Sequence, residues 1–384
     1  MIARAAARVA LVALAGLLQT PASVRSQGPA VSDTATARLR GGEAWKTHFS
    51  RHAVALSEIV SGGPRKDGIP ALDDPKFVSA VEADRWLDGR DPVIVVEHGG
   101  EARAYPLSIL LFHEIVNDRV GGLPVAVTYC PLCNTALVFE RTVDGRVLDF
   151  GTTGRLRHSD LVMYDRQTES WWQQASGDAI VGDPTGTELK LLPANTYGWK
   201  RARQLYPDLE VLSRQTGYDR PYGRNPYAGY DRDGRAPIPG FFRGPVDGRM
   251  TAMTRVAGVL LGKGWAAPFP ALRERRVAQA TVAGRPVVVF WAPGAASALD
   301  GPIVRAGRDV GQSAAFARSV GDTVLDFEWR GAAFRDRQTG STWDLSGRAT
   351  AGPLAGRRLQ PVPHADYLWF AWAAFRPNAS VWAR

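Results

Sequence analysis

The sequence repeats itself, and this internal repeat is the feature that most limits what the chain can fold into. The segment PVAVTYCPLCNTAL at residues 124–137 aligns without gaps with PVVVFWAPGAASAL at residues 286–299. Further along, the residues DRQT at 165–168 recur at 336–339. Recurrence of this kind indicates a duplicated structural unit, and 384 residues exceed what one hydrophobic core usually serves. We therefore expect two tandem copies with similar folds.

The repeat and its flanks divide the chain into five parts. Residues 1–26 have the pattern of a secretory signal, with Arg4 and Arg8 before an apolar run that is short for a membrane span. We expect residues 27–50 to be a flexible leader, 51–213 the first repeat, 214–255 a loop between the repeats, and 256–384 a degenerate second repeat. The mature protein is then periplasmic or secreted, with no integral membrane segment after signal cleavage.

Short β-like runs separated by Gly and Pro dominate both copies. Residues 125–129 and 136–139 are such runs on either side of the two cysteines, and helical patterns are confined to short stretches at 107–112 and 196–206. These patterns predict an α+β fold that is predominantly antiparallel β, with the two degenerate tandem repeats packed as a pseudo-symmetric pair.

Three polar segments of the first copy have no counterpart in the second. In the alignment, Ala292 and Ala295 replace Cys130 and Cys133, and residues 275–280 replace the segment HEIVND at 113–118. The segment LRHSD at 156–160 falls where the second copy is six residues shorter. A residue type that one copy has discarded is not required by the shared architecture. We infer that the three segments converge on a polar site in the first copy.

Two cysteines separated by two residues can both face one ion, so the first hypothesis for this site is a soft metal, copper or zinc. The candidate ligands are Cys130, Cys133, His113 and His158. Oxygen donors around them, which would hydrogen-bond the ligands or act as general bases if a metal activates water, are Glu114, Asp118 and Asp160. The sequence leaves open whether such a site catalyses a reaction.

Two other interpretations of the cysteine pair stay open. One is a thiol-disulfide redox protein, although no long helix follows Cys133 to lower a thiol pKa. The other is a non-enzymatic structural or ligand-binding module with a local disulfide. Covalent haem is excluded because Asn134 stands where that motif requires histidine, and we expect no nucleotide cofactor.

The charge of the chain bears on its partners. The formal net charge is +9, but the basic residues alternate with Asp and Glu instead of forming a stripe. Such a distribution is typical of a solvated surface, so nucleic acid is not an expected partner. A metal ion or a small molecule remains as the class of ligand, and the sequence identifies no protein partner.

The motifs around the cysteines also carry a family resemblance. With VTYCPLCNTA at 127–136, HEIVND before it and SDLVMYDRQT at 159–168 after it, the chain resembles the prokaryotic domain of unknown function family 3179. The resemblance extends over about residues 50–382. It implies an exported protein and the extent of the domain, and it implies no particular reaction.

Overall fold

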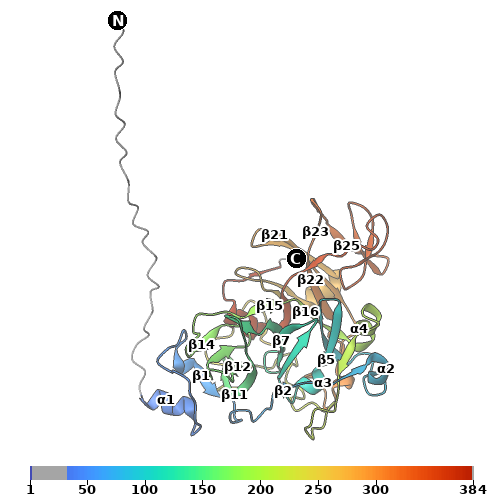
Figure 1. Cartoon of the computed structure of the whole chain (residues 1–384). Coiled ribbons are helices and arrows are strands. Elements are labelled where there is room, and N and C mark those ends of the chain that lie inside the picture. The colour runs from blue at the N-terminus through green and yellow to red at the C-terminus, as the bar shows by residue number, and fades with distance from the viewer. Residues whose placement is uncertain (2–32, 383–384) are drawn as a thin grey trace.

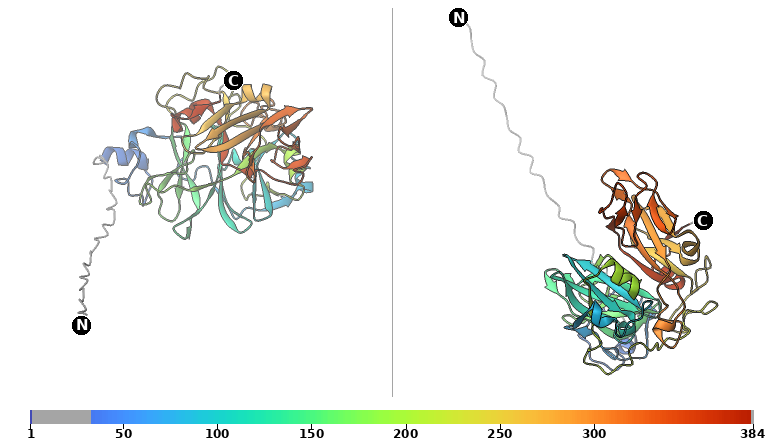
Figure 2. Two further views of the ribbon diagram at one scale, coloured as in Figure 1. Left: turned by 90° about the horizontal axis from the view of Figure 1, so that it is seen from above. Right: turned by 90° about the vertical axis from the view of Figure 1, so that its right-hand side faces the viewer.

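The computed structural model of the chain describes Met1 and residues 33–382, and it is predominantly antiparallel β (Figure 1). This coarse part of the predicted fold class is confirmed, and the longest helix in the described ranges has 8 residues. Figure 2 shows the first half, coloured blue to green, and the second half, orange to red, lying against each other. The expected signal peptide, apart from Met1, lies outside the described residues.

The first half contains three sheets of five strands. One has the order β16-β4-β5-β17-β3, with bounds Ala194–Gly198, Pro92–His98, Glu101–Pro106, Glu210–Leu212 and Phe77–Ser79. The next has the order β15-β8-β7-β6-β2, with bounds Lys190–Leu192, Thr135–Glu140, Leu123–Cys130, Ile115–Val120 and Leu72–Asp73. The third has the order β1-β11-β12-β13-β14, with bounds Ile59–Ser61, Phe150–Arg157, Asp160–Asp165, Trp171–Gln173 and Ala179–Val181.

The second half contains three sheets of four strands. Their orders are β30-β18-β19-β31, β20-β21-β22-β29 and β25-β26-β27-β28. The bounds, in that order, are His364–Leu368, Arg255–Val259, Trp265–Pro268 and Ser380–Val381; Val277–Val282, Arg285–Ala292, Gln312–Ala317 and Gln360–Pro361; and Phe327–Arg330, Ala333–Asp336, Thr342–Trp343 and Ala349–Ala351. Two small hairpins complete the strands, namely β9 (Thr142–Val143) with β10 (Arg146–Val147) and β23 (Ser319–Val320) with β24 (Thr323–Val324).

The helices are short and lie between strands. They are α1 (Asp33–Arg40), α2 (Ala80–Ala83), α3 (Leu107–Leu110), α4 (Trp199–Leu205), α5 (Phe269–Arg275), α6 (Trp369–Phe375) and the 3₁₀ turns η1 (Leu56–Glu58) and η2 (Val304–Ala306). Among the described residues, no helix is long and apolar enough to cross a membrane. The stretches at 107–112 and 196–206 contain the helices α3 and α4, but residues 196–198 belong to strand β16.

The return after the cysteine-bearing strand differs between the halves. Strand β7 turns directly into β8, so Cys130 pairs with Thr135. Strand β21 instead reaches β22 through residues 293–311, and Ala292 pairs with Gln312. The strand pairing thus departs from the gapless sequence alignment after the cysteine-bearing strand. The small residues of this longer loop resemble the aligned residues of the first half in type. They lie in a loop, however, whereas the aligned residues of the first half lead into strand β8.

The two halves share a hydrophobic core. One cluster joins the buried first-half residues Cys130, Cys133 and Trp172 to the buried second-half residues Tyr367 and Trp369. The aromatic helix α6 and strand β30 supply the second-half side of this cluster. Because burial of large aromatic side chains contributes strongly to stability, this shared core fixes the second half directly against the turn that carries the cysteines.

The segment that the sequence predicts to be a flexible leader, residues 27–50, is packed onto the first half from residue 33 onward. Leu39, Trp45 and Phe49 are buried. The Trp45 ring lies edge-on to Trp171 and to Tyr164, each with ring centroids 5.2 Å apart. Composition alone does not show this docking, because three apolar residues in a polar segment produce no periodic pattern.

Candidate metal centre

A tight backbone turn brings the cysteines to one place. Cys130 is the last residue of β7, and Cys133 lies in the turn that leads into β8. The turn closes through a hydrogen bond that the Asn134 amide donates to the Pro131 carbonyl at 3.1 Å. Asn134 has a φ of 54°, a left-handed conformation that asparagine tolerates better than most residues. Both sulfurs therefore lie on the inner side of a hairpin end, where they are buried free thiols.

Asp160 completes the group. One donor atom from each of Cys130, Cys133 and Asp160 lies within 4.8 Å of the others, and all three residues are buried. The Cys133 thiol donates to Asp160 Oδ2 at 2.9 Å. Two thiols and a carboxylate are ligand types that zinc accepts. Within residues 33–382, this set of donors has the proximity that a metal ion needs.

The Asp160 carboxylate is fixed from its other side. Its Oδ1 accepts hydrogen bonds from Gln173 Nε2 at 2.6 Å and from the Ala175 amide at 2.8 Å. Burial raises the pKa of Asp160 to about 6, against the lowering effect of the hydrogen bonds from Cys133, Gln173 and Ala175. The carboxyl group is therefore ionised at neutral pH and is oriented toward the sulfurs.

The two thiols are held in their neutral form by their surroundings. Burial raises the pKa of Cys130, and the negative charges of Asp160 and Glu114 add to this effect. Burial also raises the pKa of Cys133 well above its ordinary value, with Cys130 and Asp160 contributing. A buried pair of this kind is a poor nucleophile. A cation between the donor atoms would lower the pKa of both thiols, because it stabilises thiolates.

The hairpin between β11 and β12 places a carbonyl over the sulfurs. His158 and Ser159 have φ values of 52° and 64°, two successive non-glycine residues in the left-handed region. The Ser159 carbonyl accepts from the thiols of Cys130 at 3.6 Å and Cys133 at 3.9 Å. The Ser159 hydroxyl is buried without a hydrogen-bond partner in the described structure. Backbone strain of this kind concentrates at functional sites.

His113, a predicted ligand, does not join the cluster. Its ring is buried, with Nδ1 at 2.8 Å from the Pro70 carbonyl and Nε2 at 2.6 Å from the Tyr222 hydroxyl. Burial lowers its pKa, so the ring is neutral at pH 7. Both ring nitrogens are thus engaged with groups other than the cysteines.

His158 and Asp118 also lie apart from the sulfurs. The His158 side chain turns away, with Nε2 at 3.4 Å from the Glu58 carboxylate and its ring against Phe242 and Phe375. Asp118 accepts hydrogen bonds from Arg103 at 2.7 Å and from the Tyr105 hydroxyl at 2.6 Å. In the structure the cysteines are thus grouped with Asp160, whereas His113, His158 and Asp118 form other contacts.

Glu114 is the unusual carboxyl group of the neighbourhood. It follows α3 with a φ of 60° and is buried. Burial raises its pKa to about 8, and the charge of Asp160 adds to the shift. The group is therefore largely protonated at neutral pH. It is a proton donor close enough to the cysteines to influence the pKa of Cys130.

Sequence reasoning missed two tyrosines that face the cysteines from the loop between the halves. Burial raises the pKa of Tyr227 and of Tyr230, and the charges of the thiolate forms of the cysteines contribute to both shifts. The Tyr230 hydroxyl is buried without a hydrogen-bond partner in the described structure. The loop has no counterpart in the repeat, so comparing the copies gave no signal for these residues.

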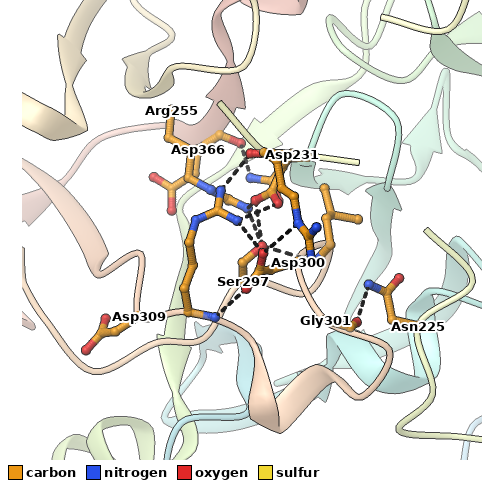
Figure 3. A network of polar contacts seen from close by, with 12 residues as sticks. Asn225, Asp231, Arg255, Ser297, Asp300, Gly301, Asp309 and Asp366 are labelled. Atoms are coloured by element: carbon orange, nitrogen blue, oxygen red, sulfur yellow. Dashed lines mark hydrogen bonds and ion pairs between the residues drawn. The ribbon is translucent and has the colours of Figure 1, made fainter. Parts of the chain in front are cut away.

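A charged network next to Tyr230 holds that loop in place (Figure 3). Asp231 is buried and accepts hydrogen bonds from Arg255 at 2.6 Å, Ser297 at 2.6 Å and Arg308 at 3.0 Å. The charge of Arg255 and these hydrogen bonds lower the pKa of Asp231 against the effect of burial. Since Arg255, Ser297 and Arg308 all belong to the second half, the network ties the loop to that half.

Comparison with known proteins assigns the chain to a family without assigning it a reaction. No curated protein and no solved structure matches it. The family model described as "Protein of unknown function (DUF3179)" matches residues 66–379, a range that includes the cysteine turn, Asp160 and the strand β30 and helix α6 of the second half. Most of the chain is covered by this match, and the protein belongs to the DUF3179 family.

Proposed function

We propose that the protein binds one zinc ion in its first half, through Cys130, Cys133 and Asp160. The observation that carries this proposal is the convergence of three donor atoms within 4.8 Å in a buried setting. Three protein ligands leave a fourth position open in a tetrahedral zinc site. The unpartnered hydroxyls of Ser159 and Tyr230 lie around that region.

The donor set favours zinc over copper. Thiolates alone would suit copper(I), whereas a carboxylate is a harder ligand that zinc accepts together with sulfur. Asp160 is oriented by Gln173 and Ala175, in the way that ligands of metal sites are usually held by hydrogen bonds from neighbouring groups. The protonated Glu114 adds a group that can deliver a proton near an open metal position.

Thiol-disulfide exchange is the weaker alternative. Redox-active cysteines are exposed thiols with a lowered pKa. Here both cysteines are buried, and burial raises the pKa of each thiol. These properties favour a pair that becomes thiolate only when a cation compensates the charge.

The test is metal content by elemental mass spectrometry on natively purified protein, with thiol titration after denaturation. We expect about one zinc per chain and two titratable thiols, and loss of the zinc in Cys133→Ser and Asp160→Asn. Asp366→Asn is the matched control, because Asp366 is another carboxylate with a raised pKa, hydrogen-bonded to Ser313 and outside the cluster. Absence of both metal and free thiols would contradict the proposal and identify a local disulfide.

We further infer that the chain arose by duplication and that the halves form a pseudo-symmetric pair. Support comes from the sheet orders: β16-β4-β5-β17 parallels β30-β18-β19-β31, and β11-β12-β13-β14 parallels β25-β26-β27-β28. Each half also has a Thr, a Ser and a Trp indole around one Asp, centred on Asp165 and on Asp336. On this proposal the second half is a scaffold that lost its cysteines.

Export to the periplasm or the exterior is part of the same proposal. Its support is the basic and apolar pattern of residues 1–26. Amino-terminal sequencing of the mature protein tests it, with cleavage before Gln27 as the expected result.

A further inference from the structure

A second candidate site lies where the first half, the connecting loop and the second half meet. A cavity of about 270 Å³ opens there. Trp86 and Ser108 come from the first half, Arg214 and Arg224 from the loop, and Arg305 from the second half. Cavities at the junction of separate structural units are common places for small-molecule binding. This one is separate from the cysteine cluster, none of whose three residues lines it.

The cavity is lined by cationic groups that have no ion-pair partner among the described residues. Among residues 33–382, no carboxylate lies within ion-pair distance of the guanidinium groups of Arg214, Arg224 or Arg305. The nearby Arg308 shows the contrast, because it pairs with Asp231 at 3.0 Å and with Asp300 at 2.8 Å. Three guanidinium groups gathered around one cavity repel one another unless an anion joins them.

One acid also lines the cavity. Asp91 is buried, and its Oδ2 accepts a hydrogen bond from the Asp88 amide at 2.8 Å, which closes a local turn. Burial raises its pKa to about 6, and the charges of Arg305 and Arg90 oppose that shift. A single carboxylate against three guanidinium groups leaves the cavity with a net positive charge.

The neutral lining suggests what else the ligand carries. Trp86 offers an aromatic face, over which Arg214 lies at 5.8 Å from the ring centroid. The Tyr222 hydroxyl is oriented by contacts with Thr216 at 2.5 Å and with His113 at 2.6 Å. His113, which the cysteine cluster does not use, therefore fixes the side chain of Tyr222, a residue that lines the cavity. The size of the cavity suits a small organic molecule and leaves room beyond one oxyanion group.

We propose that this cavity binds a small organic anion, with a carboxylate or phosphate group held by Arg214, Arg224 and Arg305 and an aromatic or apolar portion against Trp86. Guanidinium groups recognise both oxyanions through paired hydrogen bonds. The ligand would contact all three parts of the chain, so its binding would hold the connecting loop between the halves.

The experiment is isothermal titration calorimetry of the full chain at fixed ionic strength with three probes, namely phenyl phosphate, benzoate and inorganic phosphate. We expect saturable binding of phenyl phosphate or benzoate that is tighter than that of inorganic phosphate. Arg224→Gln and Arg305→Gln should each weaken it by about tenfold or more, since each removes a charge-assisted contact. Both arginines are exposed, so neither variant should disturb folding.

Arg330→Gln is the matched control, because it removes an exposed arginine that does not line the cavity and should leave binding unchanged. An equal loss of affinity in this control would mean that the probes are attracted to the net charge of the protein, and it would overturn the proposed site. Absence of saturable binding by every probe would overturn it as well, and tighter binding of inorganic phosphate would overturn the organic ligand. Binding should persist in Cys133→Ser, which separates this proposal from the zinc site.

Discussion

The Cys133 thiol donates a hydrogen bond of 2.9 Å to the Asp160 carboxylate, although 27 positions separate the two residues in the chain. This contact joins the turn after β7 to the first residue of β12, two strands that belong to different sheets. It places a proton where a metal ion would compete for the same two atoms. Several expected outcomes depend on that competition and on the contacts around it.

Binding of zinc should release protons. Both thiols are neutral without metal because burial raises the pKa of each, and zinc binds thiolates. Calorimetry at pH 7 in buffers of different ionisation enthalpy should therefore show about two protons released per zinc, with affinity that weakens as the pH falls. Binding without proton release would mean that the sulfurs are not the ligands.

The buried Asp231 network should dominate the stability of the contact between the loop and the second half. Asp231→Asn leaves the largely buried Arg255 without a counter-charge, which should cost about 3–5 kcal/mol in the free energy of unfolding. Urea denaturation followed by tryptophan fluorescence measures the change. Asp300→Asn is the control, since Asp300 is more exposed and pairs with the same Arg308, so its loss should cost about 1 kcal/mol or less.

Sequence comparison found the cysteines and Asp160 because the second copy retains none of these three residues. It did not predict that His113 lies apart from the cysteines, because joint loss shows that residues are dispensable together but gives no information on contact. His113 instead contacts the hydroxyl of Tyr222. Tyr222 lies in the loop between the halves, which has no equivalent in the repeat. The β character was predictable from short runs and turns, whereas the insertion at 293–311 was hidden by its small residues.

The contribution of His364 to stability should fall below pH 6.5. Burial lowers the pKa of His364 from 6.5 to about 4 in the folded protein. Between these two pH values the unfolded chain binds a proton at this residue and the folded chain does not. The lost stability grows as the pH drops from 6.5 toward 4 and reaches about 3 kcal/mol. Denaturation of wild type and His364→Phe across this range measures it as a difference between the two proteins.

The comparison with His364→Phe removes an opposing effect. Burial raises the pKa of Asp91, Asp160 and Asp366 to about 6 and that of Glu114 to about 8. Their folded forms therefore gain protons before the unfolded chain does, which adds stability as the pH falls through 8 and then through 6. These four carboxyls are present in both proteins and cancel in the difference. Parallel pH profiles for the two proteins would contradict the assigned role of His364.

Gly258 should tolerate no side chain. A Cβ at this position in β18 would lie 2.3 Å from the Trp372 ring, and that ring is buried in the core shared by the halves. Gly258→Ala should therefore destabilise the protein by about 1–3 kcal/mol through overpacking, seen as a lower melting temperature. Gly248→Ala meets no atom within 4 Å and should leave the melting temperature unchanged.

The Leu368 amide donates to the Cys133 carbonyl at 3.0 Å, so the cysteine turn is completed by a strand near the end of the chain. During synthesis the turn is made long before the residues that enclose it. A nascent chain that ends before β30 lacks this hydrogen bond and the second-half aromatic residues that pack in the same core cluster as the cysteines. The surroundings of the centre are therefore complete only after β30 and α6 have packed against the cysteine turn.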